Sequence, residues 1–358
     1  MLLLSITIQN QLYAKTLYSH QQAVQILDQE KTLVALNKFL TLKSTITGAE
    51  TITAWIDDPG LEPLLKEKLL YEATLIVRNQ NDDFYRDTME KLVNYQVEAF
   101  LPLNDGGHII EVAAFQVAAS AKATLLHWDI AEYTQKATNQ LNTNPGLFID
   151  ELSELKSHDI ALYGYIKTIN EAPNNQLEVI SNIIKLNHAK LPVKAFLAIA
   201  DRTADSNLYQ MLIDQYEHNK NNQSLIIRRL SNLPDSISDI DKVELLLVAT
   251  TNIALKDAAI LAMSSYVDSY EQIQTFLFST LSSIKFGGAS AKALSASKDL
   301  LTIEHLVRNL DENDTVKARY SLLALSFNNS FQAKNALITY RDSTKNLQLK
   351  KEVDQWLR

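Results

Sequence analysis

Three histidines have the most regular spacing among the residues of this chain that could do chemistry. His158, His188 and His218 follow one another at intervals of 30 residues. Imidazole is a common metal ligand, but a metal–nitrogen bond is only about 2 Å long. If the interval marks successive helix pairs, neighbouring helices pack roughly 8–10 Å apart, so three such histidines cannot readily share one ion. We interpret them as polar turn residues along one edge.

The remaining histidines and carboxylates also have simpler explanations than catalysis. In His127-Trp128-Asp129 the imidazole and the carboxylate are two positions apart, and such neighbours do not face each other on a helix. His305 stands between Glu304 and Leu306 and is expected on the surface or partly packed. Paired carboxylates occur at Asp57-Asp58, Asp82-Asp83 and Asp311-Glu312. All three flank expected helix ends, where capping and the helix dipole favour acidic residues; an acid–base pair formed through space is the alternative.

Known catalytic motifs are missing from the sequence. The glycine pairs Gly106-Gly107 and Gly287-Gly288 lack the lysine and serine or threonine of a phosphate-binding loop, and the second pair is expected where a helix turns back. There is no His-Glu-x-x-His zinc motif and no Gly-x-Ser-x-Gly nucleophile elbow. The sequence therefore identifies no catalytic, cofactor-binding or metal-binding residue, and the question of enzymatic activity stays open with a preference for none.

The elements that must position any site are helix pairs that recur from Asn144 to the C-terminus. Turn signals divide this part into seven units with starts separated by 30, 32, 32, 32, 30 and 30 residues. These starts are Asn144, Asn174, Ser206, Ser238, Tyr270, Leu300 and Ser330. The second helix of several units carries an apolar residue followed by a lysine, usually with an alanine just after it, and the third unit lacks the lysine. The copies are Val193-Lys194-Ala195, Leu255-Lys256-Asp257-Ala258, Ala291-Lys292-Ala293 and Val316-Lys317-Ala318.

This pattern resembles the HEAT-repeat family. The resemblance lies in the helix–turn–helix period, in the short Asp-containing turn of Asn313-Asp314-Thr315-Val316-Lys317, and in Val-Lys where HEAT units often have Val-Arg. It covers residues 144–358 well and the first 140 poorly, and the units are shorter than the roughly 40 residues of a standard HEAT unit. The resemblance implies an all-α fold, a right-handed α-solenoid of stacked antiparallel helix pairs. Another α-solenoid family and an irregular helical bundle are the alternatives.

We expect three regions: an apolar segment at 1–19, an irregular helical region at 20–143, and regular helical repeats of about 30–32 residues at 144–358. Helices are predicted at 20–42, 51–57, 61–77 and 84–95, with Gly48 as a break. Around the Asn104-Asp105-Gly106-Gly107 turn signal, residues 96–115 form either a small β-hairpin or a loop followed by an Ala-rich helix from Ile109.

Composition limits the classes of function. Only 8 glycines and 7 prolines in 358 residues favour helix throughout, and a hydrophobic content of 46% supplies a core. The absence of cysteine removes disulfides, thiolate metal sites and cysteine nucleophiles. A net charge of −8 disfavours nucleic acid, although an asymmetric solenoid could hide a basic face. The basic clusters Arg228-Arg229 and Lys345 with Lys350-Lys351 are interpreted as ordinary surface residues.

No apolar stretch reaches the roughly 18 residues of a membrane span. The apolar start, Met1 to Ile8, is either a truncated export signal or a first packed element. The expected location is accordingly cytoplasmic, or periplasmic or secreted if the start is a signal.

These observations favour a non-enzymatic scaffold or adaptor that binds a protein or peptide along one face of the stack. The alternatives are an enzyme or accessory domain with a pocket between the N-terminal region and the repeat stack, and an envelope assembly or chaperone-like factor. A line of exposed aromatic or charged residues at one position of successive units would support the scaffold. Tyr163, Tyr209 and Tyr266 are weak candidates that fit a core equally well, and Trp55, Trp128 and Trp356 are interpreted as core or interface anchors.

Overall fold

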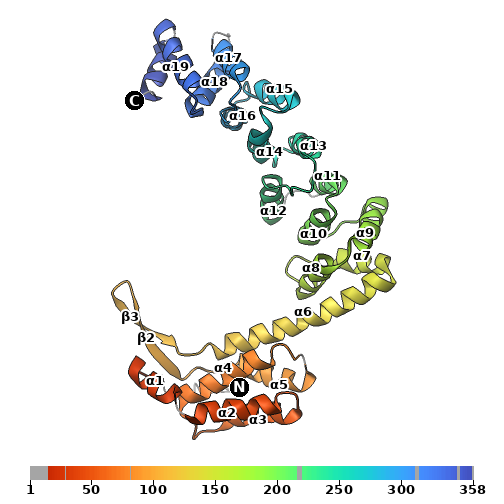
Figure 1. Ribbon diagram of the computed structural model, residues 1–358, viewed down its shortest axis with the longest axis vertical. Coiled ribbons are helices and arrows are strands. Elements are labelled where there is room, and N and C mark those ends of the chain that lie inside the picture. Colours follow the sequence, from red (N-terminus) through yellow and green to blue (C-terminus); the bar gives the residue numbers. More distant parts are fainter. Residues whose placement is uncertain are drawn as a thin grey trace, which may run out of the picture. The chain divides into compact units, whose positions relative to one another are not determined.

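The computed structural model describes residues 15–28, 30–80, 82–215, 220–310, 314–344 and 347–356. These residues are mostly helical, as predicted, with one small sheet (Figure 1). The chain divides into two compact units, Met1–Lys136 and Ala137–Arg358, and each is described by itself. The expectations for the apolar start, for Asp311-Glu312, for His218 and for the Trp356 side chain lie outside the described residues.

The first unit packs five helices and a sheet around the first part of a long helix. Its helices are α1 (His20–Leu27), α2 (Glu30–Leu42), α3 (Ile46–Asp57), α4 (Pro63–Val77), α5 (Asp83–Val93) and α6 (Val117–Thr143), which extends into the second unit. Proline is tolerated in the first turn of α4 because the N–H groups there have no partner within the helix. Phe39, Leu70, Tyr85 and Trp128 are among the buried side chains that join these helices into one core.

Gly48 lies inside α3 and does not break the chain, contrary to the sequence-based expectation. A Cβ atom at this position would lie 2.1 Å from Tyr85 Oη and 2.7 Å from the Leu42 carbonyl oxygen. The Tyr85 hydroxyl passes over Gly48 and donates a hydrogen bond to the Lys43 carbonyl oxygen at 2.9 Å. Glycine is therefore present here to let α5 approach α3 closely, which no turn pattern can reveal.

The sheet confirms the hairpin expected near residues 96–115 and excludes the helix from Ile109. Strand β2 (Ala99–Asp105) pairs with β3 (His108–Ala113) in antiparallel register, and the short β1 (Thr16–Leu17) pairs in parallel with the start of β2. Gly106 and Gly107 have φ of +58° and +93°, so this two-residue turn requires the left-handed region that glycine adopts easily. The Ala-rich stretch becomes helical from Val117, where α6 begins.

The second unit consists of helix pairs at the predicted places. The first members, which we call the first-helix row, are α7 (Pro145–Glu154), α9 (Asn174–Asn187), α11 (Ser206–Gln215), α13 (Asp239–Ala249), α15 (Glu271–Thr280), α17 (Leu300–Asn309) and α19 (Phe331–Ser343). The second members, which we call the second-helix row, are α8 (Ile160–Glu171), α10 (Val193–Thr203), α12 (Lys220–Leu230), α14 (Lys256–Ala262), α16 (Gly287–Leu294), α18 (Thr315–Phe327) and α20 (Leu347–Trp356). A single 3₁₀ turn, Met263–Tyr266, extends α14.

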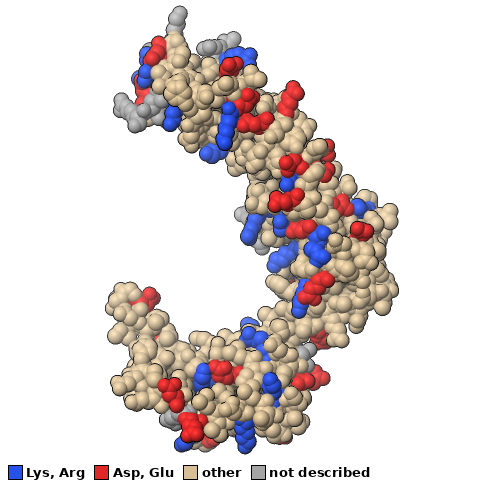
Figure 2. Space-filling view, in the orientation of Figure 1, with Lys and Arg blue, Asp and Glu red and all other residues tan. Residues whose placement is uncertain are grey.

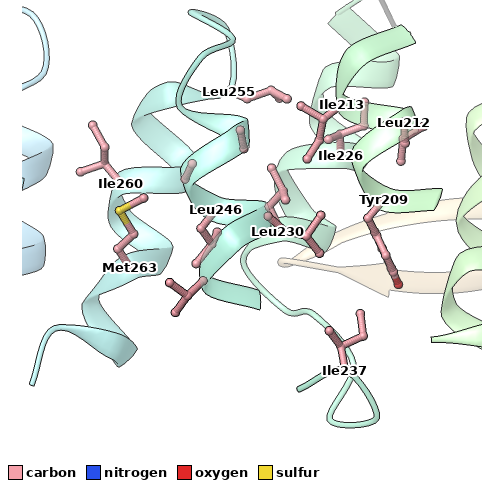
Figure 3. Packing of buried hydrophobic residues seen from close by; sticks show 14 of the residues in the cluster. Tyr209, Leu212, Ile213, Ile226, Leu230, Ile237, Leu246, Leu255, Ile260 and Met263 are labelled. Carbon is pink, nitrogen blue, oxygen red and sulfur yellow. The ribbon is translucent and has the colours of Figure 1, made fainter. Parts of the chain in front are cut away.

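The two rows follow opposite sides of this unit. In Figure 1, α8, α10, α12, α14 and α16 succeed one another along one side, and α9, α11, α13 and α15 along the other. Each helix of the second-helix row contacts the next member of the row from α8 to α20. The core lies between the rows, where side chains such as Leu212, Ile226, Leu246 and Ile260 from four consecutive helices are buried together (Figure 3).

Polar side chains connect one pair to the next at the helix ends. Arg202 of α10 donates to the Ile169, Asn170 and Ala172 carbonyl oxygens at the end of α8, which have no partners within that helix. Asp159 is the N-cap residue of α8. Further along, the buried Asn328 side chain donates to the Ser297 carbonyl oxygen at 2.7 Å.

Gly287 and Gly288 begin α16, so the expectation that they form a turn is wrong. A Cβ atom on Gly287 would lie 2.3 Å from Cδ2 of Tyr320 and 2.8 Å from the Leu281 carbonyl oxygen. The Tyr320 ring of α18 covers this glycine, and its hydroxyl donates to the Ile284 carbonyl oxygen at 2.9 Å. Gly287 therefore permits close packing of α16 against α18.

Candidate functional site

The periodic histidines do not come together in a site. His158 is exposed, and its Nε2 lies 3.7 Å from Asp159 of its own turn. His188 ends α9 in the left-handed conformation, with φ of 46°, and His218 lies outside the described residues. Within the described ranges, no group of three or more histidine and carboxylate side chains is placed to hold a metal ion.

The other chemistry-bearing residues take part in packing and helix ends. Asp129 accepts a hydrogen bond from Arg86 at 2.8 Å, and the buried Trp128 donates to the Arg78 carbonyl oxygen at 2.7 Å. His305 stacks on Phe278, with ring centroids 3.9 Å apart. Of the paired carboxylates that are described, Asp57 and Asp58 stand at the end of α3 and Asp82 and Asp83 at the start of α5.

Three of the recurring lysines of the second-helix row, Lys194, Lys256 and Lys292, are each held over an aromatic ring. The Lys194 ammonium lies 5.2 Å from the centroid of Tyr163, which belongs to α8. Lys292 lies 4.9 Å from the centroid of Phe327, which belongs to α18. A cation within about 6 Å of a ring centroid is attracted by the negative face of the ring. The lysine of one pair is thus positioned by an aromatic side chain of a neighbouring pair.

Lys256, which lies between Lys194 and Lys292 in the sequence, also contacts aromatic rings. Its ammonium lies 4.9 Å from the centroid of Phe286 and 5.8 Å from that of Phe276, and Lys285 approaches the Phe286 ring to 5.1 Å. The sequence pattern identified the lysines, but it could not identify their rings. Each ring comes from a different helix pair, and only the packing of successive pairs brings ring and cation together.

Of the three tyrosines considered from the sequence, one contributes to this row. Tyr163 is 44% exposed and carries the Lys194 ammonium, whereas Tyr209 is buried and Tyr266 packs partly buried against the core. Phe327, which sequence reasoning did not single out, is 46% exposed. We call Tyr163, Lys194, Lys256, Lys292 and Phe327 the lysine–aromatic row.

Charge is segregated between the two rows of helices. Within the described helices, the second-helix row carries twelve basic and five acidic residues, and the first-helix row carries five basic and eleven acidic residues. The basic residues of the second-helix row are Lys167, Lys194, Arg202, Lys220, Arg228, Arg229, Lys256, Lys292, Lys317, Arg319, Lys350 and Lys351. Its acidic residues are Glu171, Asp201, Asp257, Glu352 and Asp354. An acidic chain therefore contains one row of net positive charge, and Lys and Arg side chains gather along the edge formed by α8, α10 and α12 (Figure 2).

Several of these cations already serve the fold. Arg229 forms a 2.6 Å ion pair with Asp201, which also accepts a hydrogen bond from the buried Tyr209 hydroxyl. Burial raises the pKa of Asp201, while the Tyr209 hydrogen bond and Arg229 act to lower it. Arg319 pairs with Glu352 at 3.3 Å. The cluster Arg228-Arg229 noted in the sequence is thus partly structural, because Arg229 is used in the ion pair with Asp201.

The first-helix row is hollowed by apolar grooves. The groove between α17 and α19 has a volume of about 720 Å³, and Leu300, Ile303, Val307 and Phe331 line it together with Glu304 and Arg308. A second groove lies between α13 and α15, with Ile240, Tyr270 and Phe276 among its lining residues. Glu244 and Glu271 also line the second groove.

The first unit contains one carboxyl group with a strongly displaced pKa. Glu67 of α4 is fully buried, and its Oε1 accepts hydrogen bonds from the amides of Glu98 and Ala99 at 2.6 and 3.0 Å. Burial raises the pKa of Glu67 to about 7, although the two amide hydrogen bonds oppose the shift. Among the described atoms, Glu67 Oε2 and Tyr95 Oη are buried without a hydrogen-bond partner. Through its two amide hydrogen bonds, the Glu67 carboxyl group links α4 to the base of the hairpin.

Comparison with protein-family models, with curated proteins and with solved structures finds no match to this chain. No helix in the described part of the chain is long and apolar enough to cross a membrane. Any functional conclusion therefore rests on the surface features described above.

Proposed function

We propose that residues 137–358 form a right-handed, HEAT-like α-solenoid that acts as a non-enzymatic scaffold and binds a polypeptide along its second-helix row. The antiparallel succession of helix pairs and the continuous contacts from α8 to α20 support the solenoid. Stacks of this kind present long surfaces on which each unit contributes a small, similar set of side chains. The assignment of function from such a fold is an analogy, so the surface must supply the specific argument.

The lysine–aromatic row is the observation that carries the proposal. Lys194, Lys256 and Lys292 lie on three helices of the second-helix row and each contacts an aromatic ring of a neighbouring pair. The partly exposed Tyr163 on α8 and Phe327 on α18 stand at the two ends of this series. A compact small molecule would contact one or two of these groups. An extended polypeptide contacts them in succession, because it offers side chains and backbone carbonyls at regular intervals along its length.

Photo-crosslinking tests this proposal. The residue p-benzoylphenylalanine replaces Tyr163 or Phe327 in the second-helix row, and it replaces Leu301 or Phe331 in control proteins, since both are exposed on the first-helix row. We expect irradiation in native cell extract to link a discrete polypeptide to positions 163 and 327 and not to positions 301 and 331. Equal labelling at all four positions, or labelling only on the first-helix row, contradicts the proposal.

A further inference from the structure

We propose that the segment bound by the second-helix row is an acidic, extended polypeptide with carboxylates at intervals of three residues. This inference rests on the proposed function and specifies the chemistry of the partner. Its first support is that Lys194, Lys256 and Lys292 have no carboxylate within ion-pair distance among the described residues. Their ammonium groups are therefore available to a ligand.

The aromatic rings make these lysines better ligands for anions than ordinary surface lysines. A free lysine side chain loses considerable rotamer entropy when it is immobilised. The side chain of Lys194 is already restrained by Tyr163, and that of Lys292 by Phe327. The side chain of Lys256 is restrained by Phe276 and Phe286. The ring covers one side of the ammonium group but offers no oxygen atom to accept a hydrogen bond from its N–H donors. A carboxylate oxygen can accept a charge-assisted hydrogen bond from the N–H donors that remain free.

The spacing of the row sets the spacing of the ligand charges. Neighbouring helices pack roughly 8–10 Å apart, and an extended polyproline II segment rises about 3.1 Å per residue with three residues per turn. Every third side chain of such a segment therefore points the same way and advances by about 9 Å. Lys256 and Lys292 stand on consecutive members of the row, whereas Lys194 is separated from Lys256 by α12, which lacks the lysine at this position. A segment of about ten residues reaches all three lysines.

Polypeptide fits this row better than nucleic acid does. Double-stranded DNA presents one charge per about 1.7 Å and is bound by dense clusters of Lys and Arg. Here the accessible lysines are spaced a helix or more apart, and Asp257 and Glu171 are interspersed among them in the same row. Widely spaced positive charges beside aromatic rings are complementary to a polypeptide in which apolar residues separate the carboxylates.

Fluorescence anisotropy with two labelled 18-residue peptides tests the inference. The first peptide is (Glu-Pro-Pro)₆, and the second has the same composition with its six glutamates contiguous. The protein variant carries Lys194→Glu, Lys256→Glu and Lys292→Glu. The control carries Lys122→Glu, Lys298→Glu and Lys334→Glu, which change the net charge equally at exposed positions that do not belong to the helices of the second-helix row. A second variant with glutamine at positions 194, 256 and 292 removes the cations without adding negative charge, and circular dichroism checks that each protein is folded.

We expect (Glu-Pro-Pro)₆ to bind the native protein more tightly than the peptide with contiguous glutamates. The glutamate variant should weaken this binding by roughly tenfold or more, because three attractive ion pairs are replaced by three repulsive contacts. The control variant should change it less than twofold. Equal binding of the two peptides refutes the three-residue spacing. Equal losses in variant and control refute the assignment to these lysines, and tighter binding of an 18-nucleotide oligo-dT or of phosphatidylglycerol vesicles refutes the choice of polypeptide. If photo-crosslinks at positions 163 and 327 persist in the glutamate variant, the scaffold proposal stands and the acidic partner is refuted.

Discussion

Replacing Glu67 by glutamine should remove a pH dependence from the unfolding of the first unit. In the native protein the Glu67 carboxyl is fully buried and accepts two amide hydrogen bonds through Oε1. Glutamine keeps an acceptor oxygen for these amides and cannot ionise. Protonated Glu67 also retains Oε1 as an acceptor for the two amides. With the proton on Oε2, the carboxyl group is neutral and no charge is buried.

The magnitude follows from the pKa of this group. The pKa of Glu67 is about 7 in the folded protein and 4.5 for an ordinary glutamate, because burial disfavours the charged carboxylate. A raised pKa in the folded state means that the folded chain binds the proton more tightly than the unfolded chain. This stabilisation is fully present below pH 4.5 and is lost as the pH rises through 7. Its size is about 3 kcal/mol, at 1.36 kcal/mol for each pH unit.

The assay is urea unfolding followed by tryptophan fluorescence between pH 4.5 and 8. Trp55 and Trp128 both belong to the first unit, so a Trp356→Phe background confines the signal to that unit. We expect the free energy of unfolding of the native sequence, measured relative to Glu67→Gln, to fall by about 3 kcal/mol across this range. Glu72→Gln on the same helix is the control, because Glu72 is partly exposed and paired with Lys68. A difference between the native protein and Glu67→Gln that is constant with pH would refute the reasoning.

Three further predictions concern packing and turns. Gly287→Ala should destabilise the second unit by about 1–3 kcal/mol in urea unfolding, since the new Cβ meets the Tyr320 ring and a carbonyl oxygen. Gly288→Ala, whose Cβ would be 3.7 Å from Tyr320, should change stability by less than about 0.5 kcal/mol; equal effects at the two positions contradict this account. Gly106→Asn should be tolerated because asparagine adopts positive φ more readily than other residues, and hydrogen exchange in β2 and β3 should stay unchanged; faster exchange in both strands would show that the turn needs glycine itself. Arg202→Lys should cost about 1 kcal/mol and lower the melting temperature, because lysine cannot reach several carbonyl oxygens of α8 with one planar fork; an unchanged melting temperature would show that water replaces these bonds.

Local patterns predicted the secondary structure well wherever the signal is contained within one element. The helix pairs from Asn174 to Phe327 begin and end within a few residues of their turn signals. The hairpin was one of two alternatives, because alternating apolar residues beside an alanine-rich stretch fit both strand and helix. Pairing with β1 from the start of the chain and with Glu67 of α4 decides in favour of the hairpin.

Glycines show where local reasoning fails. Gly48 and Gly287 were interpreted as breaks or turns, yet both lie in helices with another residue's side chain over them. The information that explains each one is a tyrosine distant in sequence, Tyr85 for Gly48 and Tyr320 for Gly287. The sequence shows only that glycine is present. It does not show whether glycine is needed for a bend of the backbone or for the close approach of a neighbouring side chain.

By itself the sequence determined the helical class, the period of the pairs and the recurrence of lysine in the second helices, because these depend on short-range periodicity and capping. It also removed cysteine chemistry from consideration. Only the tertiary structure decided which rings hold those lysines, which arginines are already used by the fold, and that positive charge gathers on one row of an acidic chain. The physical reason is that cation–π contacts, ion pairs and surface charge depend on distances between helix pairs, and those distances are set by core packing between residues about 30 positions apart.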